Sequence, residues 1–118
     1  MLAIVGSRDF QNYDLLKSEV NNYLKEIGEY KITTIVSGGA PGTDQLAERF
    51  AKEKCLELQI FRAEWGKFGP KAGPLRNTKI VKASDFIIAF PSKNGKGTQD
   101  TIKKALDANI PIKIYWID

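Results

Sequence analysis

The sequence predicts an α/β fold, a Rossmann-like, doubly wound parallel sheet of about five strands with helices on both faces. Two observations lead to this prediction. Short apolar runs alternate with segments whose apolar residues recur at helical spacing, in the order β-α-β-α-β-α-β-α-β. The strand-like runs are continuously apolar, which is typical of parallel strands covered on both faces. Right-handed crossovers between such strands place helices on both sides of the sheet.

The predicted strands are short, and most end at glycine, serine or proline. The first run stops at Gly6, and the second, which is rich in β-branched residues, stops at Ser37-Gly38-Gly39. The strands are expected at Leu2–Val5, Ile32–Val36, Leu58–Phe61, Phe86–Phe90 and Ile112–Ile117.

The segments between these runs have the spacing of amphipathic helices. Gly28 is expected to end the first helix, and Pro74 fits the first turn of the third. Asp44 and Thr98 are expected to cap the second and the fourth. Cys55 is expected to be an inert core residue on the second. The apolar residues that define these helices are Leu16, Val20, Tyr23, Leu24 and Ile27; Ala47, Phe50, Ala51 and Cys55; Ile80 and Val81; and Ile102, Ala105 and Leu106.

Length and composition limit the possible functions. The 118 residues predict a single domain, 1–118, and no apolar run approaches the roughly 20 residues that span a bilayer, so we expect a cytoplasmic protein without a membrane partner. Histidine is absent and cysteine occurs once, which excludes Ser-His-Asp catalysis and the usual zinc sites. We expect neither a metal nor a cofactor. The net charge of +4 is compatible with anionic partners, but because the chain has no dense basic run, a solvated lysine-rich surface is the favoured interpretation.

Unusual residues concentrate in the loops that follow strands. These loops are Gly6–Phe10, Ser37–Asp44, Ala63–Ala72 with the adjoining Gly73–Asn77, and Pro91–Thr98, whereas the loops that precede strands hold ordinary turn residues. The carboxyl ends of parallel strands meet at one edge of the sheet, which is where ligands bind in such folds. The sequence therefore predicts a ligand site at this edge.

Two of these loops are rich in glycine and lead directly into helices. Glycine lets backbone N–H groups approach an anion, and a helix N-terminus adds partial positive charge. Gly38, Gly39 and Gly42 with Thr43 form one predicted cradle for a phosphate or ribose hydroxyl, and the segment 95–98 forms another. The alternative is that the glycines only make tight turns. Neither loop matches the P-loop or the dinucleotide-binding motif.

Arginine is rare in this chain, and its positions are informative. Arg8 and Arg76 are two of four arginines, and both lie on the predicted ligand edge, whereas Arg49 falls within a helix on an expected solvated face. A guanidinium matches phosphate or carboxylate with a planar fork. The alternative for Arg8 is a structural pair with Asp9 or Asp44.

The long third loop holds Trp65 and Phe68, which can either stack on a base or fold onto the protein body. The full set of predicted ligand-binding residues is Gly6, Ser7, Arg8, Ser37, Gly38, Gly39, Gly42, Thr43, Asp44, Arg76, Asn77, Gly95, Gly97 and Thr98.

Four motifs together resemble a known family. They are Gly6-Ser7-Arg8-Asp9-Phe10, Ser37-Gly38-Gly39-Ala40-x-Gly42-x-Asp44, Ala72-Gly73-Pro74-x-Arg76-Asn77, and Ala89-Phe90-Pro91 followed by Gly97-Thr98. The chain resembles the YspA/YpsA-related branch of the SLOG superfamily, which groups SMF/DprA proteins with LOG-type nucleoside-monophosphate phosphoribohydrolases. The resemblance implies a Rossmann-like domain that binds a nucleotide-derived ligand, a homodimer or higher homo-oligomer, and a possible origin in phage or conflict systems.

The chain departs from the LOG enzymes at one position. Arg76 matches their arginine early in the third helix, but Thr101 stands where they have the glutamate of Pro-Gly-Gly-x-Gly-Thr-x-x-Glu. Asp100 precedes it, about a quarter of a helical turn away, and is expected in the first helical turn beside backbone N–H groups. Hydrolysis of an N-glycosidic bond needs a carboxylate, which threonine cannot replace.

Three hypotheses follow from these residues. The leading one is a module that binds a nucleotide-derived small molecule as a sensor, carrier or sequestering protein. The second is a nucleotide or ADP-ribose hydrolase, with Asp9, Asp44 or Asp100 as the catalytic carboxylate. The third is a DprA-like binder of single-stranded nucleic acid, which the absence of an arginine-rich stripe with interleaved aromatics disfavours.

Overall fold

The computed structural model describes all residues from Met1 to Asp118 and confirms the predicted fold class. One sheet contains five parallel strands in the order β3-β2-β1-β4-β5. The strands are β1 (Leu2–Gly6), β2 (Thr34–Ser37), β3 (Glu57–Ile60), β4 (Phe86–Phe90) and β5 (Ile112–Ile114). Beyond Ile114 the chain still follows β4, because the N–H groups of Tyr115 and Ile117 donate to the carbonyls of Ala89 and Pro91.

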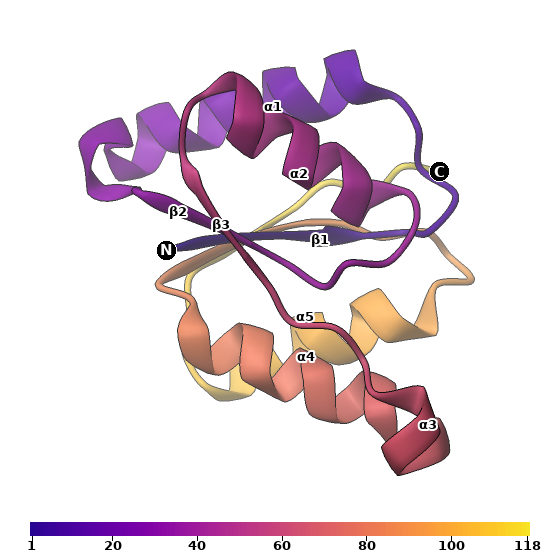
Figure 1. Cartoon of the computed structure of the whole chain (residues 1–118). Coiled ribbons are helices and arrows are strands. Elements are labelled where there is room, and N and C mark those ends of the chain that lie inside the picture. Colours follow the sequence, from indigo (N-terminus) through magenta and orange to yellow (C-terminus); the bar gives the residue numbers. More distant parts are fainter.

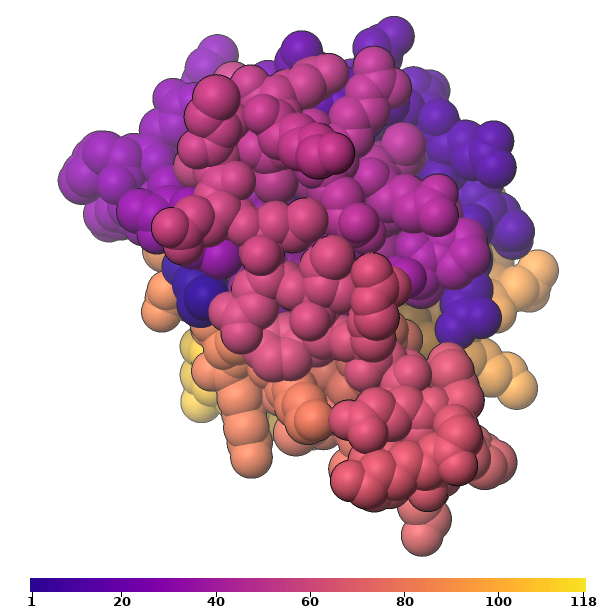
Figure 2. Space-filling view, viewed as in Figure 1, coloured from indigo at the N-terminus to yellow at the C-terminus, as the bar shows by residue number.

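Helices cover both faces of this sheet (Figure 1). The helices α1 (Tyr13–Ile27) and α2 (Thr43–Glu53) lie on one face, and α4 (Ala72–Ala83) and α5 (Lys96–Asp107) lie on the other. The expected long third loop instead holds a short helix, α3 (Trp65–Phe68), and a 3-10 turn, η2 (Gly69–Lys71); a second 3-10 turn, η1 (Glu29–Lys31), follows α1. Residues 65–71 stand out from the surface in Figure 2. No helix has the length and apolar character needed to cross a membrane.

The central strand β1 divides the core into two clusters. Leu2 and Ile4 belong to the cluster under α1 and α2, whereas Ala3 and Val5 belong to the cluster under α4 and α5. This alternation follows from the pleat, which sends successive side chains to opposite faces. The edge strand β3 is different, since Leu58 is 36% exposed. The expectation of a fully apolar environment holds for β1, β2 and β4 but not for the edge strands β3 and β5, since Ile114 of β5 is also 36% exposed.

Three local predictions were wrong. The N-caps of α2 and α5 are Gly42 and Gly95, so Asp44 and Thr98 lie inside the first helical turns. The Asp44 carboxylate turns back to accept the Ala40 N–H instead of a helical one. Cys55 is exposed, because α2 ends at Glu53 and Cys55 occupies a turn with φ +55°.

The strand order defines where the site lies. β1 and β4 are neighbours, yet β1 leads to α1 on one face and β4 leads to α5 on the other. The two connecting loops therefore diverge and leave a crevice at the carboxyl ends of these strands, the usual ligand position of doubly wound sheets.

Candidate functional site

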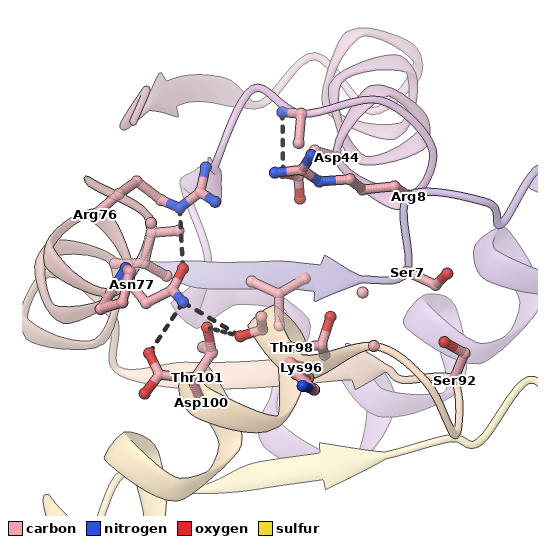
Figure 3. A pocket seen from close by; sticks show the side chains of 18 of the residues that line it. Ser7, Arg8, Asp44, Arg76, Asn77, Ser92, Lys96, Thr98, Asp100 and Thr101 are labelled. Atoms are coloured by element: carbon pink, nitrogen blue, oxygen red, sulfur yellow. Dashed lines mark hydrogen bonds between the residues drawn. The ribbon is translucent and has the colours of Figure 1, made fainter. Parts of the chain in front are cut away.

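A cavity of about 560 Å³ opens at this crevice (Figure 3). Its walls come from the loops after β1, β2 and β4, from the first residue of α3, and from α4 and α5. The lining residues are Val5, Gly6, Ser7, Arg8, Asp9, Ala40, Asp44, Trp65, Gly73, Pro74, Arg76, Asn77, Ile80, Ser92, Asn94, Gly95, Lys96, Gly97, Thr98, Asp100 and Thr101. The volume is within the range of about 300–1,000 Å³ that is usual for small-molecule sites.

The structure gathers most of the predicted ligand-binding residues here. Those that line the cavity are Gly6, Ser7, Arg8, Asp44, Arg76, Asn77, Gly95, Gly97 and Thr98, together with the other two carboxylate candidates, Asp9 and Asp100. Those that do not line it are Ser37, Gly38, Gly39, Gly42 and Thr43. Contact with a ligand stays a prediction for all of them.

The loop between β2 and α2 uses its polar groups within the protein. The Gly39 N–H donates to Ser37 Oγ and the Ala40 N–H donates to Asp44 Oδ2, at 3.2 and 3.1 Å. The N–H and the hydroxyl of Thr43 both donate to the carbonyl of Ser7. These bonds occupy the N–H groups of Gly39, Ala40 and Thr43 and the Thr43 hydroxyl, and the two bonds from Thr43 hold the loop against the end of β1.

Arg76 supports the same loop from α4. Its Nη1 donates to the Gly38 carbonyl at 2.8 Å, and its Nε donates to Asn77 Oδ1 at 2.9 Å. A Cβ at position 38 would lie only 2.7 Å from Arg76 Nη1, so a larger residue there would displace the Arg76 guanidinium from this hydrogen bond. Burial lowers the pKa of Arg76, although the Asp44 carboxylate raises it. Nη2 makes no hydrogen bond within the protein.

Asp44 is the most perturbed carboxyl group of the cavity. It is only 7% exposed, and burial raises its pKa to about 6 although the Ala40 N–H and Arg76 act in the opposite direction. Arg8 makes no ion pair with Asp44 or Asp9, so the structural pairing considered for Arg8 is wrong. Arg8 is exposed at the cavity with its guanidinium uncommitted.

The carboxylate of Asp100 is held by hydrogen bonds within the protein. Since α5 begins at Lys96, Asp100 lies beyond the first turn, and its Oδ2 accepts from Asn77 Nδ2 at 3.1 Å and from Lys104 Nζ at 2.7 Å. The expected contact with backbone N–H groups is therefore wrong. Burial raises the pKa of Asp100, but the hydrogen bonds from Lys104 and Asn77 outweigh it, and the net pKa is below its ordinary value. Asp100 links α5 to α4 (Figure 3).

The start of α5 is open toward the cavity. Its first helical hydrogen bond runs from the Gln99 N–H to the Gly95 carbonyl, so the N–H groups of residues 96–98 have no helical acceptor. Lys96 is exposed there and forms no ion pair. Thr101 is buried and donates to the Gly97 carbonyl at 3.3 Å, so it adds no ionisable group.

Sequence reasoning missed several residues. Ser92, Asn94 and Lys96 line the cavity, and the position of Lys96 between two glycines at a helix start was the signal that could have found it. Arg62, the remaining arginine, donates to the Gly39 carbonyl at 3.3 Å from β3's end. No local pattern indicated that contact, because it joins residues from two different loops.

Comparison with known proteins identifies the family. Residues 1–68 match the YspA, cpYpsA-related SLOG family. The chain is also 37% identical over 121 residues to the Gene 61 protein of Mycobacterium phage D29, covering 94% of this chain and 92% of the phage protein. The chain belongs to the YspA, cpYpsA-related SLOG family. Both this membership and the fold agree with the resemblance that the four motifs indicated.

A solved structure shares the fold of this SLOG protein. The X-ray structure of DNA processing protein A (DprA) from Streptococcus pneumoniae superimposes with a TM-score of 0.74 at 18% identity. The match covers 96% of this chain, which spans about half (49%) of the DprA chain. At this identity the similarity describes the architecture and not the activity.

Proposed function

We propose that the protein binds a nucleotide or nucleotide-derived small molecule in the cavity at the carboxyl ends of β1 and β4. One observation carries the proposal. The unpaired cations Arg8 and Lys96 and the open N–H groups at the start of α5 all face a single ligand-sized cavity. Charged donors and a helix N-terminus together form a favourable environment for phosphate. Membership of a SLOG family supports a nucleotide-related ligand.

The β2–α2 loop has a supporting role in this proposal. Arg76 and Asp44 hold Gly38 and Ala40 in place, which fixes one wall of the cavity without using its donors on the ligand. The phosphate position is therefore assigned to the β4–α5 side, while Arg8 from the β1–α1 loop lines the opposite side of the cavity beside Asp44 (Figure 3). Nη2 of Arg76 provides a further donor.

A thermal-shift screen tests the proposal. The compounds are AMP, GMP, CMP, UMP, ADP-ribose and cyclic oligonucleotides, with inorganic phosphate as the reference. A compound at a hundredfold excess over its Kd stabilises the folded state by about 2.7 kcal/mol. We expect at least one nucleotide to raise the Tm well beyond phosphate. If no nucleotide raises it, the proposal is wrong.

A charge-matched pair of variants locates the binding. Lys96→Ala removes an unpaired cation at the cavity, and Lys31→Ala removes an exposed cation on η1, outside the cavity. Loss of one charge-assisted contact weakens nucleotide binding by roughly tenfold in Lys96→Ala, whereas Lys31→Ala retains the affinity of the unmodified protein. Equal losses would indicate nonspecific attraction to the net charge.

A second candidate function, nucleotide hydrolysis, is favoured by Asp44. A carboxyl group with a pKa of about 6 inside a cavity is suited to general acid–base catalysis. Incubation with AMP, CMP and ADP-ribose, followed by detection of free base or ribose phosphate, tests it. The binding proposal expects no turnover. Repeated turnover that Asp44→Asn abolishes and Asp100→Asn retains would instead assign an enzyme with Asp44 as the catalytic residue.

A further inference from the structure

Trp65 is a large aromatic residue whose position the core does not explain. It begins α3, lines the cavity and remains 50% exposed. Neither α3 nor the following η2 turn contains a buried residue. An indole ring has a large apolar surface whose burial is stabilising, so the half exposure of Trp65 leaves much of this stabilisation unrealised in the free protein.

The indole ring nevertheless packs at a defined position. It lies against Gly73 in the first turn of α4, where an added Cβ would be 3.1 Å from Trp65 Cη2, 3.8 Å from Cζ2 and 3.9 Å from Cζ3. Glycine therefore allows the six-membered part of the indole to settle closely on the helix. This contact fixes the ring at the cavity wall while leaving half of the residue accessible.

The cavity thus combines two kinds of surface. The β1–α1 and β4–α5 loops supply cations and open N–H groups, and the α3–α4 segment supplies an apolar planar ring. A nucleotide has the same two parts, a phosphate and an aromatic base. Proteins that bind bases without sequence preference commonly stack them on an aromatic side chain, with about 1–3 kcal/mol per base.

We propose that Trp65 is the stacking surface for the base of the ligand, which narrows the ligand class to nucleotides that carry an aromatic base. This inference rests on the proposed function, since it concerns the same cavity. Base-free ribose phosphates then bind through the phosphate contacts alone, and substitution of Trp65 does not affect them.

The chain offers a matched control for this residue. Trp116 is 51% exposed and does not line the cavity. In Trp116→Phe the only remaining tryptophan is Trp65, so nucleotide binding quenches the intrinsic fluorescence. In Trp65→Phe only Trp116 remains, and binding leaves the fluorescence unchanged.

Affinity measurements by calorimetry complete the test, with AMP, GMP, CMP and UMP as base-containing probes and ribose 5-phosphate as the base-free probe. Trp65→Ala weakens binding of the nucleotides by roughly 5- to 150-fold, Trp65→Phe weakens it less, and ribose 5-phosphate changes by less than twofold. Trp65→Phe keeps a ring on Gly73 and serves if Trp65→Ala fails to fold.

The outcomes separate this inference from the proposed function. If nucleotides bind the unmodified protein and both Trp65 variants bind them equally well, stacking is wrong and the binding proposal stands. An equal loss for ribose 5-phosphate also overturns stacking, because the ring then acts on the sugar or on the shape of the cavity. If no nucleotide binds the unmodified protein, both proposals fail.

Discussion

Two glycine-rich loops meet the carboxyl edge of the sheet, and they use glycine differently. In the β2–α2 loop, Gly38 and Gly42 allow close packing, since an added Cβ would lie 2.7 Å from Arg76 Nη1 and 2.2 Å from the Arg8 carbonyl oxygen, respectively. At the start of α5, Gly97 has no atom within 4 Å of such a Cβ. The first loop is filled by the protein, and the second is open to the cavity.

The comparison extends to the carboxylates beside the two loops. Burial raises the pKa of Asp44 to about 6, whereas hydrogen bonds from Lys104 and Asn77 outweigh burial and lower that of Asp100. The charge of Asp44 is poorly compensated and that of Asp100 is well compensated. A glycine-rich strand-to-helix loop is therefore not by itself a phosphate cradle, because the surrounding side chains decide whether its donors are free.

The largest expected effect is the loss of folding stability caused by substituting Gly42. It has φ +76°, and its added Cβ would meet backbone atoms of Ser7 and Arg8 that cannot rotate away. We expect Gly42→Ala to lower the free energy of unfolding by about 3 kcal/mol or more, from backbone strain plus overpacking. Denaturant unfolding measures it.

Gly69 provides the matched control for that substitution. It also has a positive φ, +58°, but no atom lies within 4 Å of its added Cβ. Gly69→Ala therefore reports the cost of backbone conformation alone, about 1 kcal/mol. If the two variants lose equal stability, close packing of the β2–α2 loop on β1 is not what selects glycine at position 42.

The next largest effect is the pH dependence of folding stability that Asp44 causes. Its pKa is about 6 when folded and 3.8 ordinarily, so the folded state holds the proton more tightly and wild-type stability falls as pH rises through this window. Asn does not titrate. The stability of Asp44→Asn relative to the wild type should therefore rise between pH 4 and pH 7 by roughly 2 kcal/mol, at a slope of up to about 1.4 kcal/mol per pH unit.

Asp100→Asn sharpens the same comparison. The lowered pKa of Asp100 means that its contribution to stability is present above the ordinary value of 3.8 and is lost as pH falls below it. Relative stability of this variant should therefore improve on acidification, which is the opposite sign. A rise for both variants from pH 4 to pH 7 would show that Asp100 is as poorly compensated as Asp44.

The order and type of the elements could be read from the sequence because local patterns encode them. Phe86–Phe90 is a strand at the expected residues, and Gly28 ends α1 as expected. The position of the cavity at the carboxyl ends of the strands also followed, since that edge depends only on the strands being parallel. The contacts made by Arg76 and Asp100 did not follow, because each joins groups brought together by tertiary packing. The contact of Asp44 with the Ala40 N–H is local, but it depends on the conformation of the loop before α2.

The smallest effect concerns Gly97, and it tests the open loop directly. Gly97 lies in the first turn of α5 without a positive φ, so alanine fits the helix and reduces the entropy of the unfolded chain. We expect Gly97→Ala to raise the free energy of unfolding by about 0.5–1 kcal/mol. The added methyl group projects from a residue that lines the cavity, where the anion is proposed to approach the backbone, so nucleotide affinity should fall several-fold.

Gly66 in α3 is the matched control, since its added Cβ also meets nothing within 4 Å and it does not line the cavity. Calorimetry on both variants should show the affinity loss only in Gly97→Ala. If Gly97→Ala gains stability and binds nucleotides as tightly as the wild type, glycine at position 97 is not needed for ligand approach. The two glycine-rich loops then differ only in how closely the rest of the protein packs against them.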